Sequence, residues 1–249
     1  MVPWLGRKLA LSDMSLIEVG SGTGSSTLAL AQVAQSVECY ELHGGSITVA
    51  RDRLNYWDIE NVRLHQRPFD ADCEFVQAGG KADGVVLYAV LEHMTHDECL
   101  AVLALAWRVL RPGGALVVAE TPNRFSMLDE HTSWLPFFSQ LPRAIQVLYA
   151  SKSPREEFRW AIARAAESGP QQAIEAMIRW GSGISFHEFE LAIGDDIHAR
   201  IVLDGYEPEI THMVPVSDLD MTIEAAFQRW GVKAHRAFTR RHLYLVAIK

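Results

Sequence analysis

A short apolar segment followed at once by three closely spaced glycines constrains this chain more than any other feature. Residues 16–19 have the composition of a buried strand, and Gly20, Gly22 and Gly24 lead from it into an alanine-rich helix over residues 25–35. A strand that turns through glycines into a helix lets a ligand approach the backbone without meeting side chains. It also points unpaired helix amides at that ligand. The stretch therefore predicts an α/β domain that binds a nucleotide-like ligand at this turn.

The alternation of strands and helices continues after the glycine turn. Further strands are expected at residues 36–42, 62–66, 83–88 and 115–120. Along residues 100–110 apolar side chains recur at intervals of three, four and three, which places them on one face of a helix. The segment Arg111-Pro112-Gly113-Gly114 ends that helix. Parallel β/α units with right-handed crossovers, in a doubly wound sheet, follow from this order.

Residues 122–204 interrupt this alternation, and we interpret them as a helical lid and substrate-recognition insertion after strand five. The cofactor-binding core then consists of residues 1–121 and 205–249. Lid helices are expected at 143–149, 155–167 and 171–179. Towards the C-terminus the sequence predicts helices at 195–203 and 219–230, a strand at 209–214, and an antiparallel pair formed by 232–238 and 242–248.

Composition narrows the class of partner and the compartment. The 249 residues carry a net charge of −8 with no cluster of Lys or Arg, which argues against a broad nucleic-acid surface. The cysteines Cys39, Cys73 and Cys99 have neither metal-site nor disulfide spacing, so buried thiols in a reducing compartment are expected. No secretory signal and no membrane-spanning apolar segment is visible. We expect a cytoplasmic protein without a membrane span.

An acidic residue stands shortly before the glycine turn. Glu18 lies two residues before the first glycine and completes the pattern E-x-G-x-G-x-G over residues 18–24. A dinucleotide-binding loop needs a glycine at the sixth position, where Ser25 stands. The pattern resembles the first motif of class I S-adenosylmethionine-dependent methyltransferases. Taken alone, the loop also suits another nucleotide-binding α/β protein; a dehydrogenase is disfavoured by the glycine spacing.

Three more features strengthen this resemblance. Glu41 ends the second strand, where the family's acidic residue accepts hydrogen bonds from both ribose hydroxyls. Residues 87–93 resemble the family segment that passes beneath the methionine part of the cofactor, and residues 108–114 resemble its turn before strand five. The resemblance implies a Rossmann-like, doubly wound, seven-stranded and mostly parallel sheet with an antiparallel C-terminal strand, and S-adenosylmethionine as cofactor.

The resemblance also implies which residues bind the cofactor. These are Glu18, Gly20, Ser21, Gly22, Thr23, Gly24, Glu41, Leu42, Tyr88, Ala89 and His93. The family's Gly-Asp pair after strand three, which binds adenine, is replaced here by residues 66–70. Asp70 is the candidate for the adenine amino group, and Phe69 is the candidate for packing against the adenine ring.

The methyl acceptor should lie beyond the carboxyl end of strand five, where the insertion begins. His131 is a candidate general base there and Asp129 a candidate to orient it, because histidine titrates near neutral pH. His187 is a second catalytic candidate, within a segment that includes Glu188 and two phenylalanines. A structural role is the alternative for each histidine. No dense ligand spacing supports a metal site, and none is predicted.

Segments of the insertion resemble the ubiquinone-biosynthesis and the sugar or natural-product O-methylating branches of the family. This resemblance implies an enzyme that methylates a small molecule, with a hydroxyl of a sugar, polyketide or lipid-like compound as the favoured acceptor. Nitrogen or carbon methylation, and a non-catalytic cofactor-binding module, are the alternatives. The apolar stretch 134–148 either lines an acceptor pocket, lies on a membrane surface, or forms lid packing or a homodimer contact.

Overall fold

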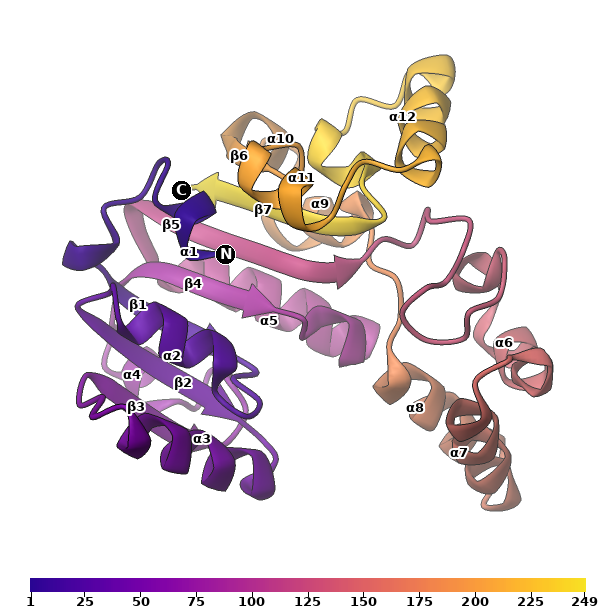
Figure 1. The fold of residues 1–249 in the computed structure, drawn as a ribbon, viewed down its shortest axis with the longest axis horizontal. Coiled ribbons are helices and arrows are strands. Elements are labelled where there is room, and N and C mark those ends of the chain that lie inside the picture. Colours follow the sequence, from indigo (N-terminus) through magenta and orange to yellow (C-terminus); the bar gives the residue numbers. More distant parts are fainter.

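The computed structural model describes residues 1–249 and contains one seven-stranded sheet in the order β3-β2-β1-β4-β5-β7-β6 (Figure 1). The strands are β1 Ser15–Val19, β2 Ser36–Glu41, β3 Val62–Gln66, β4 Ala82–Tyr88, β5 Leu110–Pro122, β6 Ile201–Asp204 and β7 His242–Ile248. The first five strands are parallel, and β7 runs antiparallel to both β5 and β6. The predicted doubly wound sheet with an antiparallel C-terminal strand is confirmed.

Helices cover both faces of this sheet. Residues of α1, α2 and α11 share a core with one face, and residues of α5, α9, α10 and α12 share a larger core with the other. The helices are α1 Val2–Leu5, α2 Ser25–Ala31, α3 Gly44–Tyr56, α4 Glu74–Gln77, α5 His96–Val109, α6 Arg143–Tyr149, α7 Glu156–Glu167, α8 Pro170–Trp180, α9 Phe186–Ile193, α10 Ile197–Arg200, α11 Pro208–Met213 and α12 Asp218–Trp230. The helix predicted from the apolar period is α5, which begins with a complete capping box at Thr95 and Glu98.

Three predictions near the C-terminus are wrong. Residues 201–203 form strand β6 rather than the end of a helix, because they pair with β7 and bury alternate side chains. Residues 208–213 form helix α11 rather than a strand, and Pro208 stands at its first position, where proline favours helix initiation. Residues 232–238 do not pair with β7; the positions beside it belong to β5 and β6.

The predicted lid contains α6, α7 and α8, which extend beyond the carboxyl ends of β4 and β5 (Figure 1). It has its own small core, in which Phe138, Phe158 and Met177 are fully buried. The chain returns to the sheet before residue 204, because Phe189 of α9 and Ile197 of α10 pack in the main core against α5. The end of the predicted insertion, 122–204, thus lies beside the sheet, and the division into core and insertion stays a prediction.

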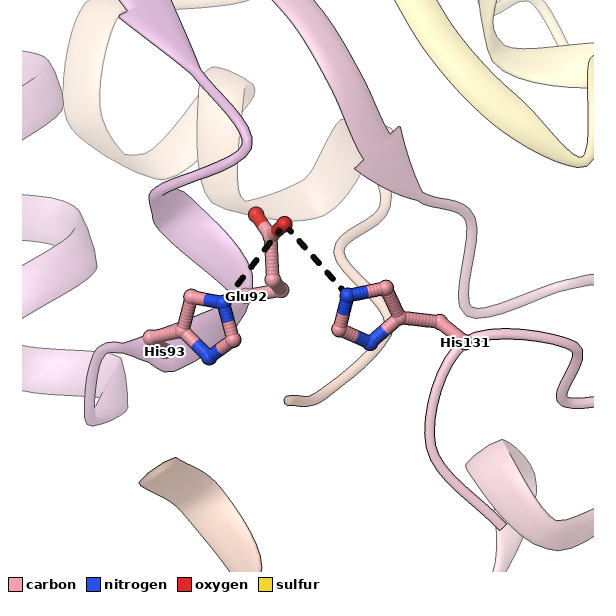
Figure 2. Close-up of side chains that lie close together, drawn as sticks. All are labelled: Glu92, His93 and His131. Atoms are coloured by element: carbon pink, nitrogen blue, oxygen red, sulfur yellow. Dashed lines mark ion pairs between the residues drawn. The ribbon is translucent and has the colours of Figure 1, made fainter. Parts of the chain in front are cut away.

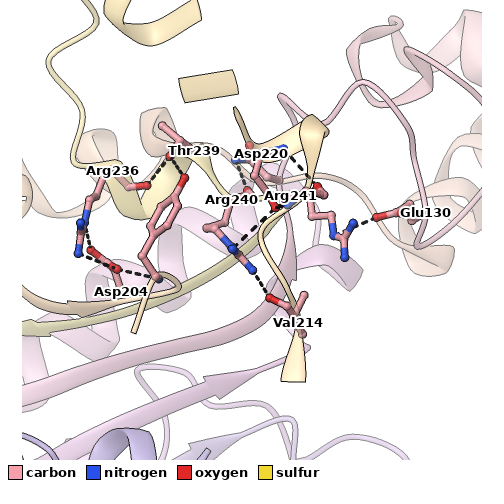
Figure 3. Close-up of polar contacts among 11 residues, drawn as sticks. Glu130, Asp204, Val214, Asp220, Arg236, Thr239, Arg240 and Arg241 are labelled. Carbon is pink, nitrogen blue, oxygen red and sulfur yellow. Dashed lines mark hydrogen bonds and ion pairs between the residues drawn. The ribbon is translucent and has the colours of Figure 1, made fainter. Parts of the chain in front are cut away.

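A buried polar network joins the C-terminal segment to the base of the lid (Figure 3). Arg240 is 1% exposed, donates to the carbonyl of Val214, and lies 3.8 Å from the buried carboxylate of Asp220. Asp220 in turn accepts the backbone N–H of Arg241 at 2.6 Å. The Arg241 side chain pairs with Glu130 in the lid at 3.4 Å. These contacts hold α12 and the entry to β7 in fixed positions beside the first lid segment.

Candidate functional site

The glycine loop after β1 has the backbone conformation that its sequence predicts. Gly20, Gly22 and Gly24 have φ angles of +74°, +52° and +78°, a region that side chains disfavour. A Cβ at Gly20 would lie 2.4 Å from the Val90 side chain, so the loop packs tightly against the segment after β4. A Cβ at Gly22 would meet nothing within 4 Å. The loop thus presents bare backbone to open space at this position.

Two acidic residues hold this loop from different sides. Glu41, at the end of β2, accepts the N–H of Gly22 and the N–H of His43, each at 2.8 Å, on separate carboxylate oxygens. Each oxygen keeps a further lone pair for a ligand hydroxyl. Glu18 is fully buried beneath the loop, accepts the Thr27 hydroxyl at 2.5 Å, and has its pKa raised by burial. Glu41 therefore keeps free acceptor capacity beside the loop, whereas the buried Glu18 supports the loop from below.

A cavity of about 430 Å³ opens beside the loop, at the carboxyl ends of β1, β2 and β4. This volume is within the range of small-molecule and cofactor sites. Seven of the predicted cofactor residues line it: Gly20, Gly22, Glu41, Leu42, Phe69, Ala89 and His93. Six predicted residues do not line it: Glu18, Ser21, Thr23, Gly24, Asp70 and Tyr88.

The positions of Asp70 and Tyr88 explain why they lie outside the cavity lining. The Asp70 carboxylate pairs with Arg67 at 3.2 Å and accepts the backbone N–H of Asp72 at 3.0 Å. It faces a neighbouring cavity of about 350 Å³ that also contacts Phe69. Tyr88 packs with the core on the sheet face covered by α2. Their predicted contacts with the cofactor stay predictions.

The cavity wall also contains residues that sequence reasoning missed, above all Arg179 of the lid helix α8. Its guanidinium contacts both carboxylate oxygens of Glu98, at 2.8 and 2.9 Å, and donates to the carbonyl of His93 at 2.8 Å. This pairing lowers the pKa of Glu98 to about 2. Arg179 and Glu98 connect the lid to the start of α5 across the cavity, and their separation in the chain hides this from local sequence patterns.

A cluster of Glu92, His93 and His131 lies at the border between this cavity and the lid (Figure 2). Glu92 and His93 follow β4, and His131 follows β5. Glu92 is fully buried, and burial raises its pKa to about 8. Burial also lowers the pKa of His131, to about 4, and the pKa of His93. Both imidazoles are thus neutral at pH 7.

The other two catalytic candidates lie outside this cluster. Asp129 accepts the backbone N–H groups of Thr132 and Ser133, at 3.0 and 2.9 Å, and therefore shapes the loop that carries His131. His187, on α9, hydrogen-bonds Ser185 at 3.1 Å and stacks on a phenylalanine ring. Sequence reasoning named His93 and His131 for separate roles, but nothing local indicated that the lid brings them to the same carboxylate.

The fold and the site together define an open α/β domain with a nucleotide-sized cavity at the carboxyl edge of its sheet. The family described as "Methyltransferase domain" matches residues 16–114, which include the glycine loop and the first four strands. The match shows that this segment, less than half of the chain, is similar to a methyltransferase domain, and it agrees with S-adenosylmethionine as the cofactor expected from the sequence. The residues fit this group, because the cavity has bare backbone at Gly22 and free acceptors at Glu41.

Three similar proteins each match less than half of this chain. Protein-L-isoaspartate O-methyltransferase 2 of Nitrosospira multiformis is 34% identical over 99 residues, which are 40% of this chain and 45% of that protein. The chain thus matches less than half of the length of this curated relative. Among solved structures, an amino pentose methyltransferase from Micromonospora echinaspora is 31% identical, with 44% of each chain covered and a TM-score of 0.36. Magnesium protoporphyrin IX methyltransferase from Synechocystis is 22% identical over 49% of this chain and 56% of that one, with a TM-score of 0.42.

The helices were also compared with the requirements for crossing a bilayer. None combines the necessary length with sufficient apolar character.

Proposed function

We propose that the whole chain is an S-adenosylmethionine-dependent methyltransferase that methylates a hydroxyl oxygen of a small molecule. The observation that carries the proposal is the cavity bounded by Gly22 and Glu41 on one side and His93 on the other. When bound, the cofactor supplies an electrophilic methyl group on a sulfonium. The protein has to align the acceptor with that group and exclude water.

Each side of the cavity has a separate task in this proposal. Glu41 holds the ribose hydroxyls through the two carboxylate oxygens that already accept backbone N–H groups. Phe69 is 3% exposed and lies in the cavity wall, where it packs against the adenine ring. Arg179 ties the lid to the opposite wall. The lid thereby covers the end of the cavity at which methyl transfer takes place.

The acceptor must lose a proton during or after its attack on the methyl carbon, while the carbon–sulfur bond breaks and its electron pair stays on sulfur. The cluster of Glu92, His93 and His131 lies where this proton leaves, because His93 belongs to both the cluster and the cavity wall. His131 is neutral at pH 7 owing to its lowered pKa, so its free nitrogen can accept a proton. We infer a general-base role for His131, with Asp129 holding its loop.

An oxygen acceptor is supported by the resemblance of the insertion to O-methylating branches and by the O-methyltransferase activity in the name of the curated relative. That relative acts on a protein, so a carboxylate of a protein is one alternative outcome. Amine or carbon acceptors, and binding without catalysis, are the others. The overall charge and the cytoplasmic location expected from the sequence agree with a small polar or lipid-like substrate.

The test uses the purified chain and two measurements. Titration calorimetry with S-adenosylmethionine and S-adenosylhomocysteine should show one site per chain. Transfer of a labelled methyl group to a panel of sugar, phenolic and lipid-like alcohols, with matched amines, identifies the acceptor atom by nuclear magnetic resonance of the product. Transfer to alcohols supports the proposal. Transfer to amines alone, or cofactor binding without transfer to any acceptor, refutes oxygen methylation.

A further inference from the structure

The carboxylate of Glu92 is buried without a compensating partner. Its side chain is fully buried, and neither oxygen has a hydrogen-bond partner. The Nε2 atoms of His93 and His131 lie 4.0 and 3.9 Å from its Oε1 atom (Figure 2). These separations are too long for hydrogen bonds. A polar group buried in this way is costly unless something neutralises it.

Hydrogen bonds on the far side of each imidazole determine which nitrogen carries the proton. The Nδ1 atom of His93 lies 2.9 Å from the carbonyl of Arg179, which can only accept, so Nδ1 is the donor. The Thr132 hydroxyl donates to the carbonyl of Gly181 at 3.1 Å. Its oxygen then accepts from Nδ1 of His131, 3.1 Å away. Both Nε2 atoms therefore present lone pairs towards Glu92.

Three electron-pair donors thus surround one small space, with ligand atoms all within 4.8 Å of one another. The geometry points to a binding site for a divalent transition-metal ion formed by Glu92, His93 and His131. An ion in the plane of these three atoms and equidistant from them lies no more than about 2.5 Å from each, against typical ligand distances of about 2.0 to 2.2 Å. Side-chain shifts of a few tenths of an ångström close that difference.

The outer hydrogen bonds support this assignment independently. Metal-bound histidines usually donate their second ring nitrogen to a carbonyl or another acceptor, which fixes the tautomer. His93 does so through the Arg179 carbonyl, and His131 does so through Thr132. Gly181 has no room for a side chain, because a Cβ there would lie 2.6 Å from the His131 ring. The lid backbone is thus shaped to hold this ring in place.

Two imidazoles and one carboxylate select the kind of ion. This donor set suits zinc, manganese, iron or cobalt, whereas magnesium prefers oxygen ligands. Three protein ligands leave coordination positions free. Because His93 lines the cofactor cavity, the free coordination positions of the ion border that cavity. If the proposed function holds, they lie beside the bound acceptor oxygen. The Nε2 lone pair of His131 that serves as the general base in the metal-free protein is the one that binds the ion, so with an ion bound the acceptor proton leaves to solvent.

The experiment measures ion binding directly. The full-length protein is freed of metal with a chelator and titrated with Co²⁺ by visible absorption, and with Mn²⁺ by electron paramagnetic resonance. We expect one ion per chain. Glu92→Gln and His131→Ala should weaken Co²⁺ binding by at least about 100-fold, more than the roughly 10- to 100-fold loss for an outer-shell partner. Glu60→Gln and His212→Ala, at exposed positions, should bind as the unchanged protein does.

Thr132→Val tests the same site without removing a ligand. It removes the hydroxyl that fixes the tautomer of His131, and it should therefore weaken Co²⁺ binding about 10- to 100-fold. Absence of Co²⁺ binding by the unchanged protein overturns the site. The site is also overturned if Thr132→Val binds Co²⁺ as the unchanged protein does and Glu92→Gln or His131→Ala, shown by circular dichroism to be folded, does so as well. S-adenosylmethionine binding is measured on the same samples: cofactor binding without Co²⁺ binding refutes the ion site alone, and the reverse result refutes the proposed function alone.

Discussion

Replacing Glu92 by glutamine should change how the stability of the metal-free protein depends on pH. The pKa of this carboxyl rises from 4.5 to about 8 on folding, because the side chain is buried. A carboxyl whose folded-state pKa is raised stabilises the protein below its unfolded pKa, and this contribution is lost as the pH rises through the folded pKa. Between these two values the loss is about 1.4 kcal/mol per pH unit.

The expected loss in the free energy of unfolding can be calculated for a given pH interval. From about pH 5.5 to about pH 7.5, the free energy of unfolding should fall by about 2 to 3 kcal/mol more in the unchanged protein than in Glu92→Gln. His131, whose lowered pKa gives a stabilising trend with rising pH, is present in both proteins and cancels in the comparison. Glutamine keeps the shape of the side chain but cannot ionise.

The assay is urea unfolding in the presence of a chelator, followed by circular dichroism at several pH values. A difference between the two proteins that stays constant over this interval would refute the reasoning, because Glu92 would then be ionised throughout. Adding Mn²⁺ should remove the extra slope of the unchanged protein, since a bound cation stabilises the ionised carboxylate. Exposed Glu60→Gln serves as the control for losing a carboxylate elsewhere.

Two further predictions concern the walls of the cofactor cavity. Gly22→Ala and Gly113→Ala both place a side chain at positive φ in open space, so each should lose about 1 to 2 kcal/mol of stability in urea unfolding. Only Gly22→Ala should also weaken S-adenosylmethionine binding, by about tenfold or more, because Gly22 lines the cavity and Gly113 does not. Equal affinities of the two variants for S-adenosylmethionine would contradict this prediction. Arg179→Ala should change stability by no more than about 1 kcal/mol, since its pairing with Glu98 is partly exposed, but it should speed hydrogen exchange in α8. Exposed Arg164→Ala is the control, and unchanged exchange in α8 would show that Arg179 does not hold the lid.

The local structures that the sequence predicts correctly are those set by neighbouring residues in the chain. The glycine turn, the strand before it and the acidic residue ending β2 depend on local backbone geometry and on strand order, which alternating patterns reveal. Asp70 shows the limit of this approach. The register of the loop after β3 is not determined by any periodic pattern, and the Asp70 carboxylate pairs with Arg67 without lining the cavity itself.

The remaining features depend on contacts between distant segments. Ile201–Asp204 is short and apolar, and only its pairing with β7 makes it a strand. Arg179 reaches the cavity because α8 packs beside the segment after β4. Glu92 and His131 meet because the lid returns across the carboxyl edge of the sheet. No local pattern contains this information, so the arrangement of Glu92, His93 and His131 could not be predicted from the sequence.

The most direct test of the account is the affinity of the purified protein for S-adenosylmethionine, compared with that of Glu41→Ala. Glu41 offers two charged acceptors to the ribose, and losing them should weaken binding by at least about 100-fold. Exposed Glu60→Ala should bind as the unchanged protein does. Saturable binding at one site that Glu41→Ala weakens to this extent is the predicted result. No measurable binding, or equal affinity in all three proteins, would contradict the assignment of this cavity to the cofactor.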